Sequence, residues 1–329
     1  MYRRFGIELN TFASGAPIQL KTTRAAFRNS VSNNYFGLGI YTTGSAAIQN
    51  TDVNGNTGFG SFIKYTTGTG LLGKIAISNS AFNENGTYGL SIGGKYDTPT
   101  QANNASSVTL DRVSVSGNGS YGAVIFNDNN TASVTLRRSS FEGNTGNGLE
   151  VDSLGAISVD SIAVTANGGY GARLDNQKMA QTGGVTLKTS YWTSRFLDNT
   201  SGAGLVILSN GAVSLAGLEA SRNSDHGLSI NTNSTLAVKD ALLFSNGADG
   251  INADAQGTMS LNAISSQGNS QDGAQLVTNA GVIKVQSSAF NGNAVNGLWL
   301  DIPTATSYTL INVIKAGNGG LDLKLDITP

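Results

Sequence analysis

The sequence predicts an all-β protein, a three-sided right-handed parallel β-helix of about thirteen coils with three short strands in each coil. Two observations predict this fold. The commonest spacing of a repeated glycine is 23 residues, as from Gly227 to Gly250, which indicates a stack of similar units. Each such glycine is followed by a hydrophobic residue (Ser61 is the exception), any residue and an aliphatic residue, and the pattern recurs at Gly6, Gly37, Gly60, Gly89, Gly122, Gly148, Gly171, Gly204, Gly227, Gly250, Gly273, Gly297 and Gly320.

Each unit contains three stretches in which apolar and polar residues alternate. In residues 134–156 the first stretch runs from Val134 to Leu136, the second ends at Phe141, and the third begins at Gly148. Turn residues separate the stretches, as is typical of short β-strands. Three such strands cannot form a sheet within one unit, but each can pair with its equivalent in the next unit at about 4.8 Å. We therefore expect one β-helix domain over residues 1–329, as part of a longer chain or of an end-to-end assembly.

Asparagine stands four residues before the repeated glycine in most units, which predicts an asparagine ladder at one turn. Asparagine tolerates the left-handed backbone conformation and can bond to its equivalent in the next coil, so we expect a structural role. The expected members are Asn33, Asn56, Asn85, Asn118, Asn144, Asn167, Asn223, Asn246, Asn269 and Asn293, with Asn199 one position away from the pattern.

The repeats also resemble those of a known group of proteins. Units such as residues 161–172, with the sequence SIAVTANGGYGA, look like the β-helix repeats of large bacterial surface proteins, including adhesins. Those repeats belong to the wider pectin-lyase-like superfamily, and the resemblance covers nearly the whole chain. It implies the fold but leaves the function open, because the same fold carries lyases, hydrolases, phage tailspikes and adhesins.

The composition narrows the possible partners and locations. Only 12% of the residues are charged and the net charge is −1, which argues against nucleic acid as a partner because a binding face would need many cations. The chain has no cysteine and no apolar stretch long enough to span a membrane. A cysteine-free chain rich in Ser, Thr and Asn is typical of bacterial extracellular proteins. We therefore expect an extracellular or cell-surface location, with the export signal outside this sequence.

Aromatic residues occupy the position before the glycine in most N-terminal coils, at Phe5, Phe36, Phe59, Tyr88, Tyr121 and Tyr170. The rings can form an offset stack that seals a turn, or a platform for a flat sugar face or a partner protein. Connections after the third strand are lengthened in several coils, in residues 64–66, 94–97, 127–131 and 175–183. Another insertion, residues 190–195, places Trp192 at a different edge.

Together the aromatic residues and the long connections predict a shallow trough over the third strands of the N-terminal half. Its outward-facing residues are expected to be Glu8, Gly39, Phe62, Ser91, Val124, Glu150 and Arg173. The candidate ligand-binding residues of this trough are Phe36, Phe59, Phe62, Tyr88, Tyr96, Tyr121, Tyr170 and Arg173.

Acidic residues are expected to meet on one side of the trough. Glu150 and Asp152 point the same way on one strand, with Arg173 and Asp175 at the equivalent positions one coil later. Three interpretations stay open: a Glu150–Arg173 ion pair with solvated acids nearby, a cation site, or the paired carboxylates of a glycoside hydrolase. A polygalacturonase arrangement is excluded, because the fragments that resemble its motifs, around Asn50 and His226, lie six coils apart.

A second group of acids lies at the turn before the glycine in the C-terminal coils. Asp249 and Asp272 are neighbours in this column, between His226 and Asn296. They are a candidate site for calcium, a hard cation that prefers oxygen ligands, and solvated turn acids are the alternative. We expect no other cofactor.

The sequence thus favours a non-catalytic structural and adhesive segment of a bacterial surface protein, with a surface glycan or another surface protein as its partner. One alternative is a polysaccharide hydrolase or lyase, including the phage tailspike type, that uses Glu150, Asp152, Asp175 and Arg173. The other is a self-assembling filament subunit that joins further copies through open coil ends.

Overall fold

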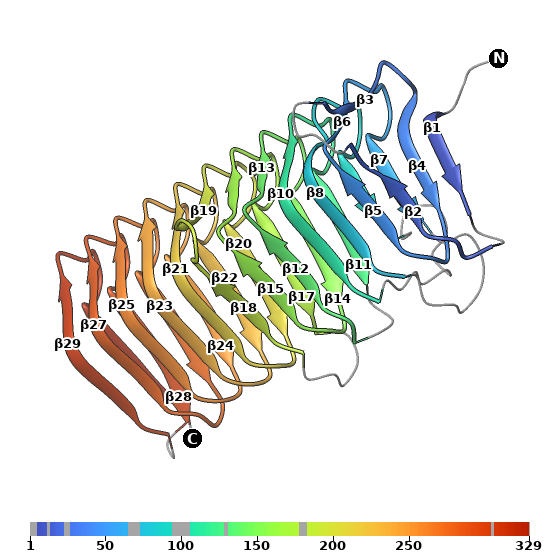
Figure 1. Cartoon of the computed structure of the whole chain (residues 1–329). Coiled ribbons are helices and arrows are strands. Elements are labelled where there is room, and N and C mark those ends of the chain that lie inside the picture. Colours follow the sequence, from blue (N-terminus) through green and yellow to red (C-terminus); the bar gives the residue numbers. More distant parts are fainter. Residues whose placement is uncertain are drawn as a thin grey trace.

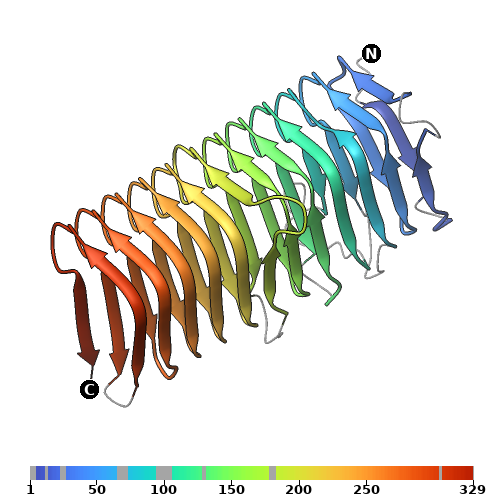
Figure 2. The same ribbon diagram turned by 60° about the vertical axis from the view of Figure 1, so that its left-hand side comes forward.

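The chain forms a parallel β-helix in which successive coils stack along one axis (Figure 1). This computed structural model describes residues 5–11, 14–22, 27–64, 73–93, 106–127, 131–177, 183–303 and 306–328. Seen from a second side, the coils remain regularly stacked, and the N- and C-termini lie at opposite ends (Figure 2). The predicted fold class is confirmed, although complete coils are somewhat fewer than thirteen because the first described strand belongs to the last side of its coil.

The glycine-containing stretches form one parallel sheet of thirteen strands, here called sheet A. Its strands pair in register, so that Glu150 lies beside Arg173 and Asp152 beside Asp175. In order along the axis they are β1 (Phe5–Asn10), β4 (Phe36–Tyr41), β7 (Ser61–Lys64), β9 (Leu90–Ile92), β11 (Ala123–Asn127), β14 (Leu149–Ser153), β17 (Ala172–Asn176), β20 (Leu205–Ser209), β22 (Leu228–Thr232), β24 (Ile251–Ala255), β26 (Ala274–Thr278), β28 (Leu298–Pro303) and β30 (Leu323–Thr328).

The other two sides of each coil, the first and second faces, precede sheet A along the chain. The first face contains β2 (Ile18–Leu20), β5 (Ala46–Gln49), β12 (Val134–Arg137), β15 (Ile157–Asp160) and β18 (Val185–Lys188). The second face contains β3 (Asn29–Ser32), β6 (Thr51–Asn54), β13 (Ser140–Glu142), β16 (Ala163–Thr165) and β19 (Ser194–Leu197). Seven bent strands cross both faces: β8 (Ile75–Ala81), β10 (Val108–Ser116), β21 (Val213–Ser221), β23 (Leu236–Phe244), β25 (Met259–Gln267), β27 (Ile283–Asn291) and β29 (Tyr308–Ala316).

A single residue with positive φ forms the corner between the first and second faces in most coils. One left-handed residue turns the chain sharply without interrupting the pairing on either side, which explains the continuous bent strands. The corner residues are Asn50, Asn79, Arg112, Arg138, Ser161, Gly217, Asp240, Ala263, Ser287 and Asn312.

We expect Ala263→Gly at this corner to stabilise the protein by about 0.5–1 kcal/mol. Ala263 has a φ of 56°, and this conformation costs a residue with a Cβ about 1–2 kcal/mol, which exceeds the extra chain entropy of glycine, about 0.4–1 kcal/mol. Thermal unfolding followed by circular dichroism measures the change. The control is Ala237→Gly in the middle of an arm of β23, which should destabilise instead. Equal shifts in the same direction for both variants would contradict the explanation.

The asparagine ladder is confirmed, with corrections to its members and to its backbone conformation. Asn34, not Asn33, is the first member, since its backbone N–H and its Nδ2 donate to Asn56 Oδ1. The ladder also includes Asn199, which accepts from Asn167 and donates to Asn223. The left-handed residue of this turn is the one before each ladder asparagine, such as Gly143 before Asn144, and not the asparagine itself.

The last coil differs from its predicted alignment by two residues. Leu298, which directly follows the repeated glycine of β28, pairs with Leu323 of β30. Asp322, rather than Gly320, therefore occupies the glycine position, and Asn318 rather than Asn293 is the last described ladder residue.

The core consists of apolar columns that run along the axis. Each side of a coil contributes inward residues, such as Leu136 from the first face, Phe141 from the second and Leu149 from sheet A, and all three are fully buried. Because every side chain in a column repeats at the coil spacing, the interior is continuous and the functional features lie on its outer faces and turns.

Candidate functional site

Four of the six predicted aromatic residues form a stack at the turn before sheet A in the N-terminal half, and the side chain of Phe5 lies outside the described part. The rings of Phe59 and Tyr88 lie 5.1 Å apart at 10°, and those of Tyr88 and Tyr121 lie 5.3 Å apart at 8°. Phe36 extends the stack at 5.6 Å from Phe59 in a tilted arrangement. All four side chains are half-buried. We call Phe36, Phe59, Tyr88 and Tyr121 the aromatic stack.

The stack connects to the outward surface of sheet A. Phe62 lies 6.0 Å from Phe59 and 6.3 Å from Tyr41, so aromatic rings pass from the turn onto the sheet. Tyr41 was not predicted, because its position, four residues after the glycine, is aromatic in few coils. In the first coils the rings therefore cover both the turn before the strand and the outward surface of the strand itself.

Tyr170 stands apart from the stack. The intervening coil has Asn147 at this position, and Asn147 Oδ1 accepts a hydrogen bond from the backbone N–H of Tyr170. The ring packs against Gly202, where a Cβ would lie 2.5 Å from it, and the side chain is 37% exposed. Tyr170 is therefore not part of the aromatic stack, and its ring contacts Gly202 instead.

In the middle of the expected trough, residues at outward positions of sheet A are buried. Val124 is at an outward position of β11 but is fully buried, and Ser91 and Glu150 beside it are 5% and 9% exposed. Tyr96 and most of the long connections, residues 65–72, 94–105, 128–130 and 178–182, lie outside the described residues. Within the described part, the accessible portion of this edge is the aromatic stack with Phe62.

The predicted acidic cluster is present, and Arg173 holds it together. Its guanidinium lies 2.6 Å from Asp175, 2.9 Å from Asp152 and 3.6 Å from Glu150. The side chains of Asp152, Asp175 and Glu150 are only 1%, 7% and 12% exposed. The expectation of solvated acids is therefore wrong, because all three carboxylates are buried around one cation.

The carboxylates of this cluster stabilise the charged form of Arg173. Burial alone would lower the pKa of the guanidinium, but the charges of Asp175 and Asp152 outweigh it and raise the pKa. Asp175 Oδ1 also accepts a hydrogen bond from the backbone N–H of Gln177. The cluster is thus a buried ion network that connects β14 with β17.

The turn column of the C-terminal coils is a hydrogen-bond ladder. The backbone N–H of Asp272 donates to Asp249 Oδ1 at 2.8 Å, and Asn296 donates to Asp272 Oδ1 from both its backbone N–H and its Nδ2. His226 Nδ1 accepts from the backbone N–H of Asp249 at 3.1 Å. Burial and the nearby charge of Asp249 raise the pKa of Asp272. Asp249 and Asp272 thus each accept a hydrogen bond from a backbone N–H of the equivalent turn in the next coil, as Asn147 does from Tyr170.

No group of three or more His, Cys, Asp or Glu side chains in the described ranges is arranged to hold a metal ion. The same ranges contain no helix with the length and apolar character that crossing a bilayer requires. Calcium binding at Asp249 and Asp272 stays a prediction that a titration would test.

Asp254, on the outer surface of sheet A, is a carboxylate that the fold stabilises poorly. Its Oδ1 is buried without a hydrogen-bond partner in the described part of the chain, and burial raises its pKa. Because the folded state favours the protonated form, the stability from this group is present below its unfolded pKa and lost as the pH rises through its folded pKa.

We therefore expect Asp254→Asn to raise the thermal midpoint by about 1–2 °C at pH 7 and to change it little at pH 3. Thermal scans at the two pH values measure the difference. Glu142→Gln, which changes an exposed carboxylate, is the matched control and should have no pH-dependent effect. A gain for Asp254→Asn that is equal at both pH values would argue against burial of the charge as its cause.

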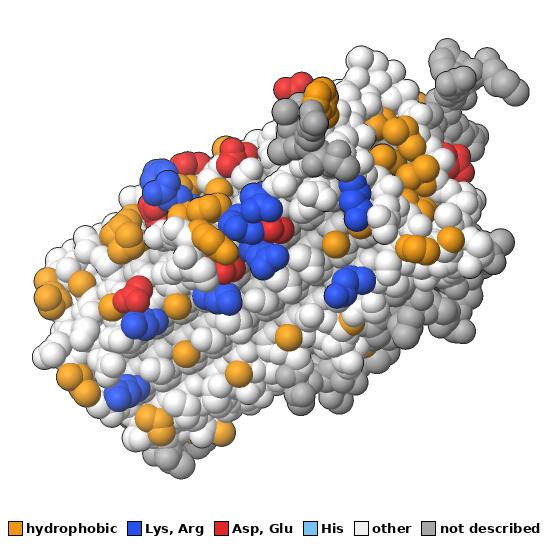
Figure 3. All heavy atoms as spheres, viewed as in Figure 1, with side chains coloured by type: hydrophobic (Ala, Val, Ile, Leu, Met, Phe, Trp, Pro, Cys, Tyr) orange, Lys and Arg blue, Asp and Glu red, His pale blue; other side chains and the backbone are white. Residues whose placement is uncertain are grey.

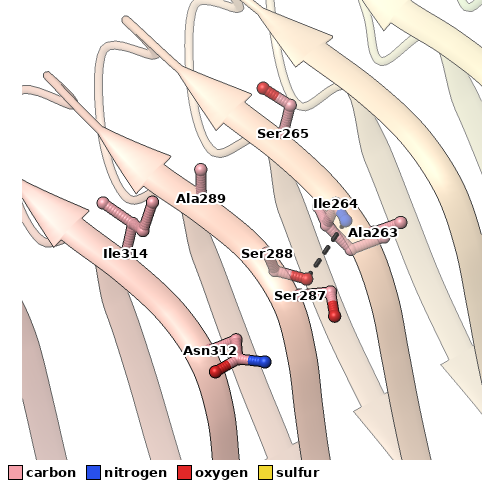
Figure 4. Close-up of a pocket in the computed structure, with 8 residues that line it drawn as sticks. All are labelled: Ala263, Ile264, Ser265, Ser287, Ser288, Ala289, Asn312 and Ile314. Carbon is pink, nitrogen blue, oxygen red and sulfur yellow. Dashed lines mark hydrogen bonds between the residues drawn. The ribbon is translucent and has the colours of Figure 1, made fainter.

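Two further surface features were not predicted. Trp299 lies outward on sheet A, with Lys324 Nζ 3.6 Å from its ring centroid and its indole N–H donating to Asp326. A shallow hollow of about 420 Å³ lies over the corners of β25, β27 and β29. Figure 4 shows the side chains that line it and the hydrogen bond from the Ile264 N–H to Ser288 Oγ. No charged side chain lines it, so we assign it no ligand.

Comparison with known proteins agrees with the geometry. The family model described as right handed beta helix region matches residues 14–187 and, in a second overlapping match, residues 101–300. Comparisons with curated proteins and with solved structures gave no match. The match is consistent with the pectin-lyase-like superfamily that the repeats resemble. With its glycine repeat, three parallel faces and asparagine ladder, the chain belongs to the right-handed β-helix family.

Proposed function

We propose that this chain is the structural and adhesive β-helix segment of an extracellular bacterial surface protein, and that it has no catalytic activity. Its ligand is a surface glycan or another surface protein, which it contacts through the aromatic stack and Phe62. The observation that carries the proposal is the stack itself, because half-buried rings at regular spacing lie along the turn that leads into sheet A.

The aromatic stack suits adhesion for physical reasons. Rings held by neighbours and by the coil lose little side-chain freedom when a ligand binds, so the entropic cost of binding is small. The accessible parts of the rings offer apolar contact to the flat face of a sugar or to an apolar side chain of a partner. A repeating ligand such as a polysaccharide can contact several coils at once.

The acidic cluster supports a non-catalytic role. A general acid or base must reach the bond that it protonates or the water that it activates. Asp152 and Asp175 are instead buried and paired with Arg173, at 2.9 Å and 2.6 Å. A hydrolase or lyase that uses Glu150, Asp152, Asp175 and Arg173 is therefore the alternative and not the leading function.

A glycan array on the intact chain and on Tyr88→Ala and Tyr121→Ala variants tests the proposal. We expect binding of one glycan class, weakened at least fivefold by either substitution. Tyr308→Ala, at a ring that is 37% exposed and lies far from the stack, should bind as the unmodified chain does.

Three outcomes would contradict the proposal. Binding that is insensitive to Tyr88 and Tyr121 would move the ligand site elsewhere. Reducing ends released from a polysaccharide, and abolished by Asp152→Asn, would establish the enzyme alternative. Filaments in negative-stain images that form without ligand would favour the self-assembly alternative.

A further inference from the structure

The corner between β18 and β19 carries an insertion that sets it apart from the neighbouring coil. Asp160 pairs with Lys188, and Ala163 pairs with Arg195, so residues 189–193 occupy the place of Ser161 alone. The insertion presents Tyr191 and Trp192 to solvent, with 55% and 47% of their surfaces exposed. We call these two residues the aromatic knob.

The backbone of the knob is fixed to the coil beneath it. The Ser190 N–H donates to Asp160 Oδ1 at 2.8 Å, and the N–H groups of Tyr191 and Trp192 both donate to Ser161 Oγ at 3.1 Å. Burial alone would raise the pKa of Asp160, but hydrogen bonds from Ser190 and Ser161 and the charge of Lys188 outweigh it and lower the pKa. Hydrogen bonds from the loop backbone to Asp160 and Ser161 thus fix the position of the loop, and side-chain packing is not its only support.

The rings are supported as well. The guanidinium carbon of Arg138 lies 4.6 Å from the centroid of Tyr191, a cation–π contact. Arg138 is itself held by two hydrogen bonds to Asp111, at 2.8 Å and 2.6 Å. The Tyr191 and Trp192 rings lie 6.3 Å apart and are tilted by 53°, so they form a protruding pair and not a flat platform.

The surface beside the knob is positive. Arg112 and Arg137 both approach Asp111, at 3.5 Å and 3.7 Å, and their side chains are 50% and 43% exposed, whereas that of Asp111 is 10% exposed. Asp160 is also buried. The cations therefore face solvent while the carboxylates that hold them lie beneath. Figure 3 shows basic side chains gathered near the middle of this face, next to hydrophobic ones and with a few acidic ones among them.

We propose that the aromatic knob, with Arg112 and Arg137, is a docking surface for an acidic segment of a protein partner, in which apolar side chains stand next to carboxylates. Trp, Tyr and Arg are the residues that most often dominate protein–protein binding energy, and they do so as anchors that fill pockets on the partner. The anchored backbone keeps the ordering cost of binding small. The surface lies on a different side from the aromatic stack, so it is independent of the proposed function.

The geometry favours a protein over other anionic partners. Glycans are usually held in concave sites or on coplanar rings, and this pair is convex and tilted. Nucleic acid requires a longer track of cations than the few around Asp111. An acidic protein surface satisfies both the exposed rings and the exposed guanidiniums.

Selection of random 12-residue peptides displayed on phage, against the immobilised chain, tests the proposal. In a Trp299→Phe background Trp192 is the only tryptophan, so its fluorescence reports binding at the knob. We expect enriched peptides that combine Asp or Glu with apolar residues and change this fluorescence. Their affinity is measured by the fluorescence anisotropy of a dye-labelled peptide, because Trp192→Ala lacks the reporting indole. It should fall at least tenfold in Trp192→Ala and at least threefold in Arg137→Ala, and it should weaken as salt increases.

Matched variants control for general effects of the substitutions. Tyr35→Ala removes a ring that is 56% exposed elsewhere, and Lys239→Ala removes a cation further along the same face, so both should retain affinity. Peptides that bind equally well to Trp192→Ala would overturn the proposal. So would a fluorescence response to heparin, polygalacturonate or duplex DNA in the absence of any peptide response, which would assign the knob to that ligand class.

Discussion

Asn144→Ala should destabilise the protein by about 3–5 kcal/mol, because it removes one member from the middle of the buried asparagine ladder. Asn144 Oδ1 accepts from the backbone N–H and the Nδ2 of Asn118, at 3.1 Å and 2.8 Å. Asn144 Nδ2 donates to the Val115 carbonyl and to Asn167 Oδ1. Alanine leaves these groups in a turn where Asn118 and Asn144 are each 1% exposed, so water replaces the lost partners poorly.

The loss should be local along the axis. In a solenoid each coil contacts only its neighbours, and long arrays do not unfold as one unit. We therefore expect hydrogen exchange to accelerate most in β10, β13 and β16, the strands that lead into this part of the ladder, with smaller changes in distant coils. Asn233→Ala, at an exposed asparagine that donates to Asn210, is the control and should cost less than about 0.5 kcal/mol. Similar exchange in the two variants would show that the ladder contributes little.

The ladder also shows how far the sequence predicts the structure. The repeat predicted the fold because a fixed period forces equivalent residues into columns, and counting back from the glycine located most ladder residues. Counting failed where the turn changes length. Asn34 replaces Asn33, and Asp322 takes the glycine position of the last coil. The register of the paired strands decides which residue lies in a column, and this residue is not always the nearest Asn or Gly in the sequence.

The candidate sites were predicted less completely, since burial and long-range contacts are not periodic. The repeat predicted that Asp152, Asp175 and Arg173 lie next to one another on sheet A. It did not predict that the two carboxylates are buried, because their burial depends on the side chains that cover this part of the sheet. The insertion with Trp192 was recognised by length alone. Its support by Arg138 could not be seen, because the two residues approach each other only after the coils between them have stacked.

Replacing Arg173 is expected to cause the second large loss of stability. Arg173→Met should destabilise the protein by about 3–5 kcal/mol at pH 7, because it leaves buried carboxylates without their shared cation. The partners are Asp152, Asp175 and Glu150, at 2.9 Å, 2.6 Å and 3.6 Å from the guanidinium. Arg222→Met is the matched control. Arg222 pairs with Asp198 at 2.7 Å, but both side chains are about half exposed, so the loss should stay below about 1 kcal/mol.

The deficit of Arg173→Met should depend on pH. Without the cation, the three buried carboxylates repel one another when they are charged, and protonation removes this repulsion. The deficit should therefore be largest at pH 7 and shrink towards pH 4. Chemical denaturation at several pH values measures it. Adding Asp152→Asn and Asp175→Asn to Arg173→Met should recover much of the loss at pH 7, because the uncompensated charges are then gone. A deficit that is independent of pH and unchanged by these two substitutions would mean that Arg173 stabilises the coils through its packing and not through its charge.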